Sequence, residues 1–235
     1  MLKVVDSAVP LACWSCSVAH NESTLFCPHC SKIQPPSGGD YFSVFGLQPH
    51  LNLDLAALEH EFYRLSRKLH PDRFARAGEN EQQWSLADTA LLNDAYRTLK
   101  DPLRRTEYLL KLQGARIAGS DVETISNGSN RKGPSRVPVD LLEKVFDLNM
   151  QLEEMRMAKK MGREDPELRE SLVKANEKFD ALVAAVDRDL RAQWQIWDAG
   201  DAAAREPAQR AMAALLDRRR YLGNLVRDVS EILGV

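Results

Sequence analysis

Four cysteines near the start of the chain are spaced like the ligands of a metal ion. Cys13 and Cys16 form one Cys-x-x-Cys pair, and Cys27 and Cys30 form a second pair after ten intervening residues. Each pair fits a tight turn in which two sulfurs point at one ion, so two pairs complete a tetrahedral four-thiolate site. The pattern predicts one structural zinc ion, and four thiolates also suit iron.

Two disulfides are the other use of four cysteines. The spacing disfavours them, and so does the first stretch of the chain, MLKVVDSAVPLA, which lacks the apolar core of a secretory signal. A closed four-cysteine site leaves no open position for catalysis, so its expected role is to fold a segment too small to bury a core. Trp14 and Phe26 lie beside ligands and are expected to pack against the two turns.

A second polar cluster lies in RKLHPDRF, residues 67–74. His70, Pro71 and Asp72 follow a helical pattern that proline cannot continue, and alone they are typical of a polar turn. Three cations lie just before the tripeptide and alone are typical of a solvated helix face: Arg64, Arg67 and Lys68.

The whole chain has the composition of a helical protein without a strong charge. Hydrophobic residues make up 44%, charged residues 28%, and the formal net charge is −2. A near-neutral total gives no global attraction to nucleic acid. No apolar run approaches the roughly 20 residues that cross a bilayer. We therefore expect an all-α fold, with neither nucleic acid nor a membrane as partner.

Composition divides the chain into residues 1–36, 40–112, 113–137 and 138–235. The first segment holds every cysteine, and Ser37-Gly38-Gly39 after it is expected to act as a flexible joint that isolates it. The third is a polar linker rich in Gly, Ser and Asn, and its portion from Ser120 to Arg136 is expected to be a disordered loop.

Local signals predict the helices of the second segment. Asp54 is a good N-cap for a helix that must stop before Pro71. A second helix is expected from Glu81 to Lys100, which places residues 70–80 at the exposed end of a hairpin. A short third helix is expected to follow through Leu112.

Three long helices are expected in the last segment: the first at about 139–161, the second from Pro166 to about Trp197, and a third that has Pro207 near its start and runs to about Leu233. Gly162 is a plausible residue after the first, and Asp165 a plausible N-cap of the second. Trp194 and Trp197 close the second helix and are expected to serve as core or as packing at the helix end.

The first of these helices is apolar around more than one stripe, which indicates one buried face and one recognition face. A core can be filled by Leu141, Val145, Leu148 and Leu152. A separate stripe with a spacing of four is formed by Leu142, Phe146 and Met150, and residue by residue the choice between core and interface stays open.

Taken together, these motifs resemble a known family. Residues 40–112 resemble a J domain, with DYFSVFGL at 40–47, the tripeptide at 70–72 and PLRRTEYLL at 102–110. The order of cysteine segment, J domain and helical bundle is similar to the HscB family of iron–sulfur co-chaperones, and the cysteine segment looks like its eukaryotic branch.

The resemblance implies a co-chaperone, not an enzyme. His70, Pro71 and Asp72 would trigger ATP hydrolysis by a 70-kDa heat-shock chaperone of the DnaK/HscA type, on which Arg64, Arg67 and Lys68 dock. The bundle would bind the scaffold on which iron–sulfur clusters are built, of the IscU type, through Leu142, Phe146, Asp147, Met150, Arg220 and Tyr221. Glu143 and Met150 depart from the family's residue types, which leaves the exact footprint open. The implied compartment is the mitochondrial matrix, while an N-terminus with one lysine and no arginine leaves the cytosol open.

Two other classes stay open. A different zinc-containing J protein, such as the type serving diphthamide synthesis or an electron carrier, would lack the long bundle. A zinc-knuckle nucleic-acid binder would carry a basic patch, but residues 13–30 contain no lysine or arginine. No Ser-His-Asp or paired-carboxylate set falls at a spacing that predicts catalysis.

Overall fold

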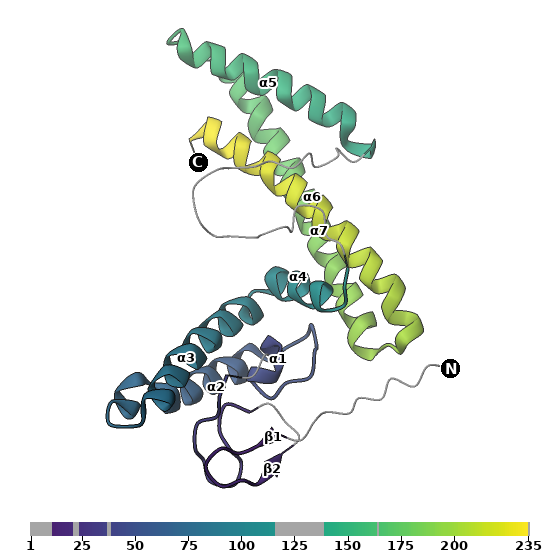
Figure 1. Cartoon of the computed structure of the whole chain (residues 1–235). Coiled ribbons are helices and arrows are strands. Elements are labelled where there is room, and N and C mark those ends of the chain that lie inside the picture. The colour runs from purple at the N-terminus through teal and green to yellow at the C-terminus, as the bar shows by residue number, and fades with distance from the viewer. Residues whose placement is uncertain (1–10, 21–23, 37–38, 116–138, 164, 235) are drawn as a thin grey trace. The chain divides into compact units, whose positions relative to one another are not determined.

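The computed structural model describes residues 11–20, 24–36, 39–115, 139–163 and 165–234, and its elements are shown in Figure 1. The chain forms two compact units, residues 1–105 and 106–235. The cysteine segment and the helical hairpin share the first unit, and the bundle forms the second. The expected linker loop at Ser120 to Arg136 lies outside the described residues.

Helices dominate both units, which confirms the all-α prediction. The first unit contains β1 (Leu11–Ala12), β2 (Ala19–His20), α1 (Tyr41–Val44), α2 (Leu55–Leu69), the 3₁₀ turn η1 (Pro71–Phe74) and α3 (Glu79–Lys100), and α4 (Pro102–Leu112) crosses into the second. The two strands pair antiparallel, Leu11 with His20 and Ala12 with Ala19, inside the cysteine segment.

Helix α2 begins and ends where the sequence predicts. The Asp54 carboxylate accepts hydrogen bonds from the backbone N–H groups of Ala56 at 2.9 Å and Ala57 at 3.0 Å. At the other end Pro71 cannot continue the helix, so the carbonyl of Leu69 lies outside the helical ladder. The buried Ser85 hydroxyl of α3 donates to this carbonyl at 2.6 Å. The end of α2 is thereby fixed to α3.

Apolar residues from three helices fill the space around the hairpin. The buried set includes Phe42, Phe45, Leu58, Leu65, Leu69, Leu92, Ala95 and Leu99. At the exposed edge of the pair, the ring of Phe62 on α2 stacks on that of Tyr96 on α3, with centroids 4.1 Å apart. These contacts hold α2 and α3 side by side.

The second unit contains η2 (Val139–Leu141), α5 (Leu142–Lys160), α6 (Pro166–Ala199) and α7 (Ala202–Leu233). Asp165 caps α6 by accepting from Leu168 N–H at 3.0 Å, and Gly162 has the positive φ of +65° that ends α5. Pro207 lies near the start of the last helix, as predicted. Asp201 accepts a hydrogen bond from Ala204 N–H at 3.0 Å and caps the first turn, so α7 begins at Ala202 and contains Pro207 in its second turn.

The bundle core matches the expected pattern. Leu141, Val145, Leu148 and Leu152 are buried, as are both tryptophans expected to be core or end packing, Trp194 and Trp197. Opposite charges tie the elements together: Arg218 binds Asp140 at 2.6 Å, Arg219 binds Asp187 at 2.5 Å and Arg220 binds Glu107 of α4 at 3.0 Å. Among the described residues, none of the helices could cross a membrane.

Asp88 is a carboxyl group in the interior of the hairpin unit. Its residue is 0% exposed, and neither carboxyl oxygen has a hydrogen-bond partner among the described residues. Burial raises the pKa of Asp88 from 3.8 to about 7. The neutral form is therefore the one that the fold accommodates.

Replacing Asp88 by Asn should make stability less sensitive to pH. The folded pKa lies above the unfolded one, so the stability linked to the proton is complete below about pH 4 and is lost as the pH rises through about 7. The loss should reach up to about 4 kcal/mol by pH 8, at 1.36 kcal/mol per pH unit. Urea unfolding at pH 5 and pH 8 should measure about 3 kcal/mol of this loss, because the remainder has already occurred below pH 5. Asp94→Asn, an exposed change on the same helix, is the control, and equal pH slopes for wild type and Asp88→Asn would contradict the assignment.

Candidate functional site

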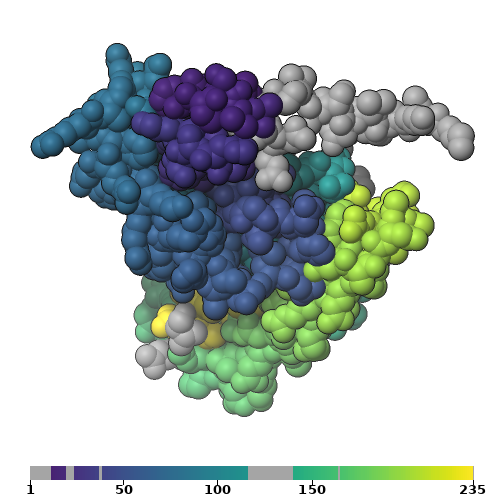
Figure 2. Space-filling view, turned by 90° about the horizontal axis from the view of Figure 1, so that it is seen from below, coloured from purple at the N-terminus to yellow at the C-terminus, as the bar shows by residue number. Residues whose placement is uncertain are grey.

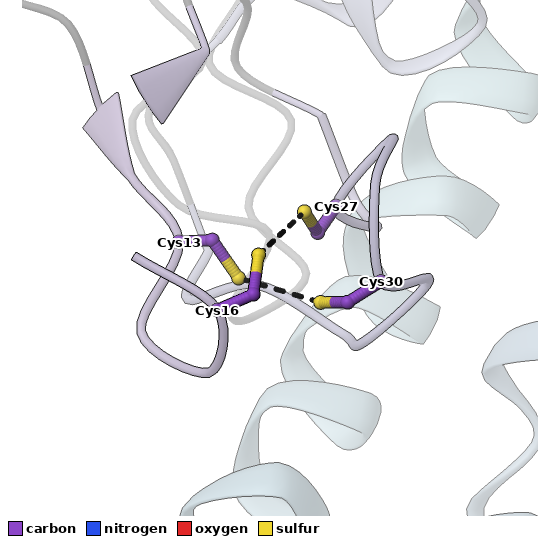
Figure 3. Close-up of side chains that lie close together, drawn as sticks. All are labelled: Cys13, Cys16, Cys27 and Cys30. Atoms are coloured by element: carbon purple, nitrogen blue, oxygen red, sulfur yellow. Dashed lines mark hydrogen bonds between the residues drawn. The ribbon is translucent and has the colours of Figure 1, made fainter. Parts of the chain in front are cut away.

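The four cysteine sulfurs converge on one point (Figure 3). They all lie within 4.8 Å of one another, with Sγ–Sγ distances of 3.6 Å between Cys13 and Cys30 and 3.8 Å between Cys16 and Cys27. A disulfide needs about 2.05 Å, so these are free thiols and not two bridges. A tetrahedral zinc site with Zn–S bonds of about 2.3 Å has S–S edges of about 3.8 Å. The cluster therefore fits a four-thiolate metal ion.

The two Cys-x-x-Cys turns repeat one backbone pattern. In the first, Ser17 N–H donates to Cys13 O at 2.9 Å and Ser15 N–H points at the Cys13 sulfur at 3.4 Å. In the second, Ser31 N–H donates to Cys27 O at 2.9 Å and His29 N–H points at the Cys27 sulfur at 3.4 Å. A serine with a φ of +59° follows each pair, at positions 17 and 31. The repeat CxxCS was a visible signal of this symmetry that sequence reasoning missed.

The pKa values of two of the thiols, Cys13 and Cys16, are shifted in opposite directions. Burial acts to raise the pKa of Cys13, but hydrogen bonds from the backbone of Cys16 and Ser15 outweigh it and lower the pKa to about 6. A backbone hydrogen bond at Val18 acts to lower the pKa of Cys16, but burial and the neighbouring thiols outweigh it and raise the pKa to about 12. Four adjacent thiols cannot all ionise alone, and a bound cation removes this conflict.

The tripeptide lies at the exposed end of the helical hairpin, as predicted. Pro71 opens η1, and the His70 Nδ1 atom accepts from Asp72 N–H at 3.3 Å. The Asp72 side chain is 90% exposed, and one of its oxygens lies 3.5 Å from the same Nδ1 atom. The backbone of this turn is fixed by proline and by its own hydrogen bonds, while the carboxylate is presented to solvent.

The three predicted cations beside the tip are all exposed but not equivalent. Arg64 forms an ion pair with Glu61 one turn earlier, whose hydrogen bond lowers the pKa of the glutamate. Lys68 lies over the ring of Phe26, 5.8 Å from its centroid. Two further arginines are exposed next to the tripeptide, Arg73 and Arg76. They were missed, although the sequence DRFAR places them in the turn itself.

Helix α5 presents a second candidate surface. Phe146 is 65% exposed, whereas Leu148, two residues further on, is 2% exposed. Leu142, Met150, Met157 and Met161 are exposed as well, and together with Phe146 they follow one face along the length of α5. Asp147 is exposed beside this stripe. The stripe therefore does not belong to the bundle core.

Arg220 and Tyr221, expected opposite that stripe, lie half-buried on α7. Arg220 pairs with Glu107 of α4 at 3.0 Å and lies 3.7 Å from Asp217. Burial raises the pKa of Tyr221. A different arginine of α7, Arg218, lies near the start of α5. It binds Asp140, the residue before the buried Leu141. Sequence reasoning missed Arg218, because only the folded bundle brings residues 78 positions apart into contact.

Comparison with known proteins gives the family. A co-chaperone protein HscB homolog of Vibrio cholerae is 36% identical over 156 residues, which cover 66% of this chain and 78% of that protein. The chain belongs to the HscB family. No family model matches it.

Two mammalian HscB proteins are also similar. The mouse protein, named an iron–sulfur cluster co-chaperone, is 36% identical over 135 residues, and the human one 39% over 109 residues. These alignments cover 56% and 45% of this chain, and 54% and 46% of the relatives. The chain thus spans about half the length of these two HscB proteins.

Solved HscB structures share the fold. The crystal structure of human co-chaperone HscB matches with a TM-score of 0.63 and 25% identity, covering 94% of this chain and 98% of that one. HscB from Vibrio cholerae matches with a TM-score of 0.55 and 26% identity, covering 83% and 97%. The likeness therefore extends over most of the chain.

The thiol cluster predicts one metal ion per chain. Purified protein should contain one equivalent of zinc by elemental analysis, and Cys16→Ser should lower that content because a hydroxyl is a poor substitute for a thiolate ligand. Ser15→Ala, in the same turn, removes no ligand and should keep the full equivalent. A full equivalent of iron without zinc would show that the site serves iron.

Proposed function

We propose that this HscB-family chain is a co-chaperone of iron–sulfur cluster assembly. It binds the cluster scaffold through α5 and delivers it to a heat-shock chaperone of the DnaK/HscA type, whose ATPase its tripeptide stimulates. The observation that carries the proposal is the solvent-presented tripeptide at the end of a braced hairpin, with Asp72 90% exposed. The chain is an activator of its partner's catalysis and not itself an enzyme.

The partner chaperone recognises the conformation of the turn formed by His70, Pro71 and Asp72. Pro71 fixes one backbone dihedral, and the His70 imidazole holds Asp72 N–H, so little conformational entropy remains to be lost on binding. The Asp72 carboxylate is then a free acceptor for a donor on the chaperone. His70 acts by shaping the turn, and Asp72 by contact.

The cations around the tip supply attraction to an acidic partner. Arg64 is already paired with Glu61, so the exposed Arg67, Arg73 and Arg76 are left to interact with the chaperone. Exposed charges of this kind act mainly on the association rate and are screened by salt.

The α5 stripe supplies the scaffold contact. Exposed Leu142, Phe146 and Met150 offer apolar anchors with Asp147 at their edge. Arg220 and Tyr221 of α7 belong to the proposed footprint, and Glu107 holds the guanidinium of Arg220. The ion in the thiol cluster is proposed to be structural zinc, held by Cys13, Cys16, Cys27 and Cys30. Residence in the mitochondrial matrix stays a prediction from the resemblance.

Changing His70 to Gln should remove the stimulation of ATP hydrolysis, because the shaped turn is lost while the exposed site costs little stability. Single-turnover hydrolysis by the chaperone measures this, with and without scaffold. His60→Gln, a change at an exposed histidine of α2, the helix that His70 follows, is the matched control. Arg67→Glu should weaken the same stimulation, and the wild-type effect should fade with added salt. An unchanged rate with His70→Gln would refute the co-chaperone mechanism.

Changing Phe146 to Ala should weaken scaffold binding without lowering the melting temperature. A truncated interface anchor costs about 1–4 kcal/mol of binding free energy. Leu148→Ala is the matched change on the buried face and should cost about 2–5 kcal/mol of stability. Calorimetric titration and thermal unfolding of both variants separate the two faces. If Phe146→Ala melts as early as Leu148→Ala, the stripe is core and not an interface.

A further inference from the structure

The cysteine segment is packed against the hairpin, contrary to the isolation predicted from the Ser37-Gly38-Gly39 joint. In Figure 2 its purple surface adjoins the blue surface of the hairpin unit. The contacts come from residues placed one or two positions from the cysteines: Trp14, Phe26 and Lys32. The turns that hold the thiol cluster are therefore in direct contact with the helices.

These contacts fall on both sides of the tripeptide loop. On the N-terminal side of the loop, Lys68 in the last turn of α2 lies over the ring of Phe26, with its Nζ atom 5.8 Å from the ring centroid. On the C-terminal side of the loop, Lys32 forms an ion pair at 3.3 Å with Glu81, which lies in the first turn of α3. Residues 70–78 connect the two points. The cysteine segment thus contacts both ends of the loop.

Glu81 links the segment to the loop directly. One carboxylate oxygen accepts from Lys32, and the other accepts at 3.3 Å from the backbone N–H of Gly78, the residue that starts α3. The same half-buried side chain therefore closes the loop and anchors it to the second Cys-x-x-Cys turn.

Trp14 makes the contact depend on both turns. It follows Cys13 in the first turn, yet its indole N–H donates to the buried Ile33 carbonyl, just past the second turn, at 2.7 Å. Its ring then meets that of Trp84 on α3 edge-on, with centroids 5.6 Å apart. Trp14 therefore contacts both turns and α3 at once, and an ion shared by the four thiols would hold the two turns together.

We infer that the metal-loaded cysteine segment is a clamp on the base of the tripeptide loop, through Trp14–Trp84 and Lys32–Glu81. Loss of the ion separates the two turns and releases both contacts, so the ends of residues 70–78 gain freedom. Because such coupling is reciprocal, breaking the contacts from the helix side also weakens metal binding. The consequence for chaperone stimulation rests on the proposed function, whereas the clamp itself does not.

The first test measures metal affinity from the helix side. Trp84→Leu should raise the Zn²⁺ dissociation constant of the full chain by about 2- to 10-fold, which is the effect expected from losing one aromatic pair. Competition with a chromogenic chelator measures this constant. Leu86→Ala, an exposed apolar change two residues along α3, is the control and should leave it unchanged. Glu81→Gln should act like Trp84→Leu, with Glu79→Gln as the control in the same turn. Unchanged affinity in both Trp84→Leu and Glu81→Gln would overturn the clamp.

The second test measures the loop itself. Amide hydrogen exchange over residues 70–80 should be faster after zinc removal by a chelator, and Trp84→Leu with zinc bound should show part of the same acceleration. Exchange in α6 and α7 should not change. Identical exchange of the loop with and without zinc would overturn the clamp. A chain whose loop responds to zinc but which never stimulates the chaperone would instead refute the proposed function and leave the clamp standing.

Discussion

The first unit depends on one constraint, the forced end of α2 before Pro71. Proline has no N–H to continue the helix, so the chain must turn and the carbonyl of Leu69 needs a new donor. Ser85 supplies it from inside the hairpin at 2.6 Å, and Thr89 points at the same carbonyl at 3.4 Å. This one shared acceptor sets how far along α3 the end of α2 lies. The tripeptide is exposed because it must span that fixed end and the start of α3.

Much of the fold could be predicted because short local sequence patterns mark the ends of helices. Asp54, Asp165 and Gly162 all act at the positions where their residue types predict caps. The start of α7 follows the same rule. Asp201 caps its first turn, and Pro207, one turn further on, removes only one backbone hydrogen bond of the helix.

The candidate sites could be located from the sequence, but their connections could not. The cysteine pairs, the tripeptide and the α5 stripe can each be recognised from residue spacing, because each pair and the tripeptide lie within one turn and the stripe lies within one helix. The Trp14–Trp84 ring contact and the Arg220–Glu107 pair join residues 70 and 113 positions apart, and nothing in either neighbourhood marks the partner. Long-range contacts of this kind form only in the folded chain. The glycine-rich joint alone therefore predicts, incorrectly, that the cysteine segment is isolated from the hairpin.

The size of the contacts explains why metal binding can influence the loop without being required to fold the hairpin. An exposed ion pair, a cation over a ring and an edge-on aromatic pair each contribute about 1.5 kcal/mol or less. The buried leucines of α2 and α3 contribute about 1.5–3 kcal/mol each. Removing the clamp therefore cannot unfold the helices, yet its energy is comparable with that of opening a surface loop. Under the proposed clamp, a metal-binding segment attached this way changes the mobility of the tripeptide and leaves the hairpin that carries it intact.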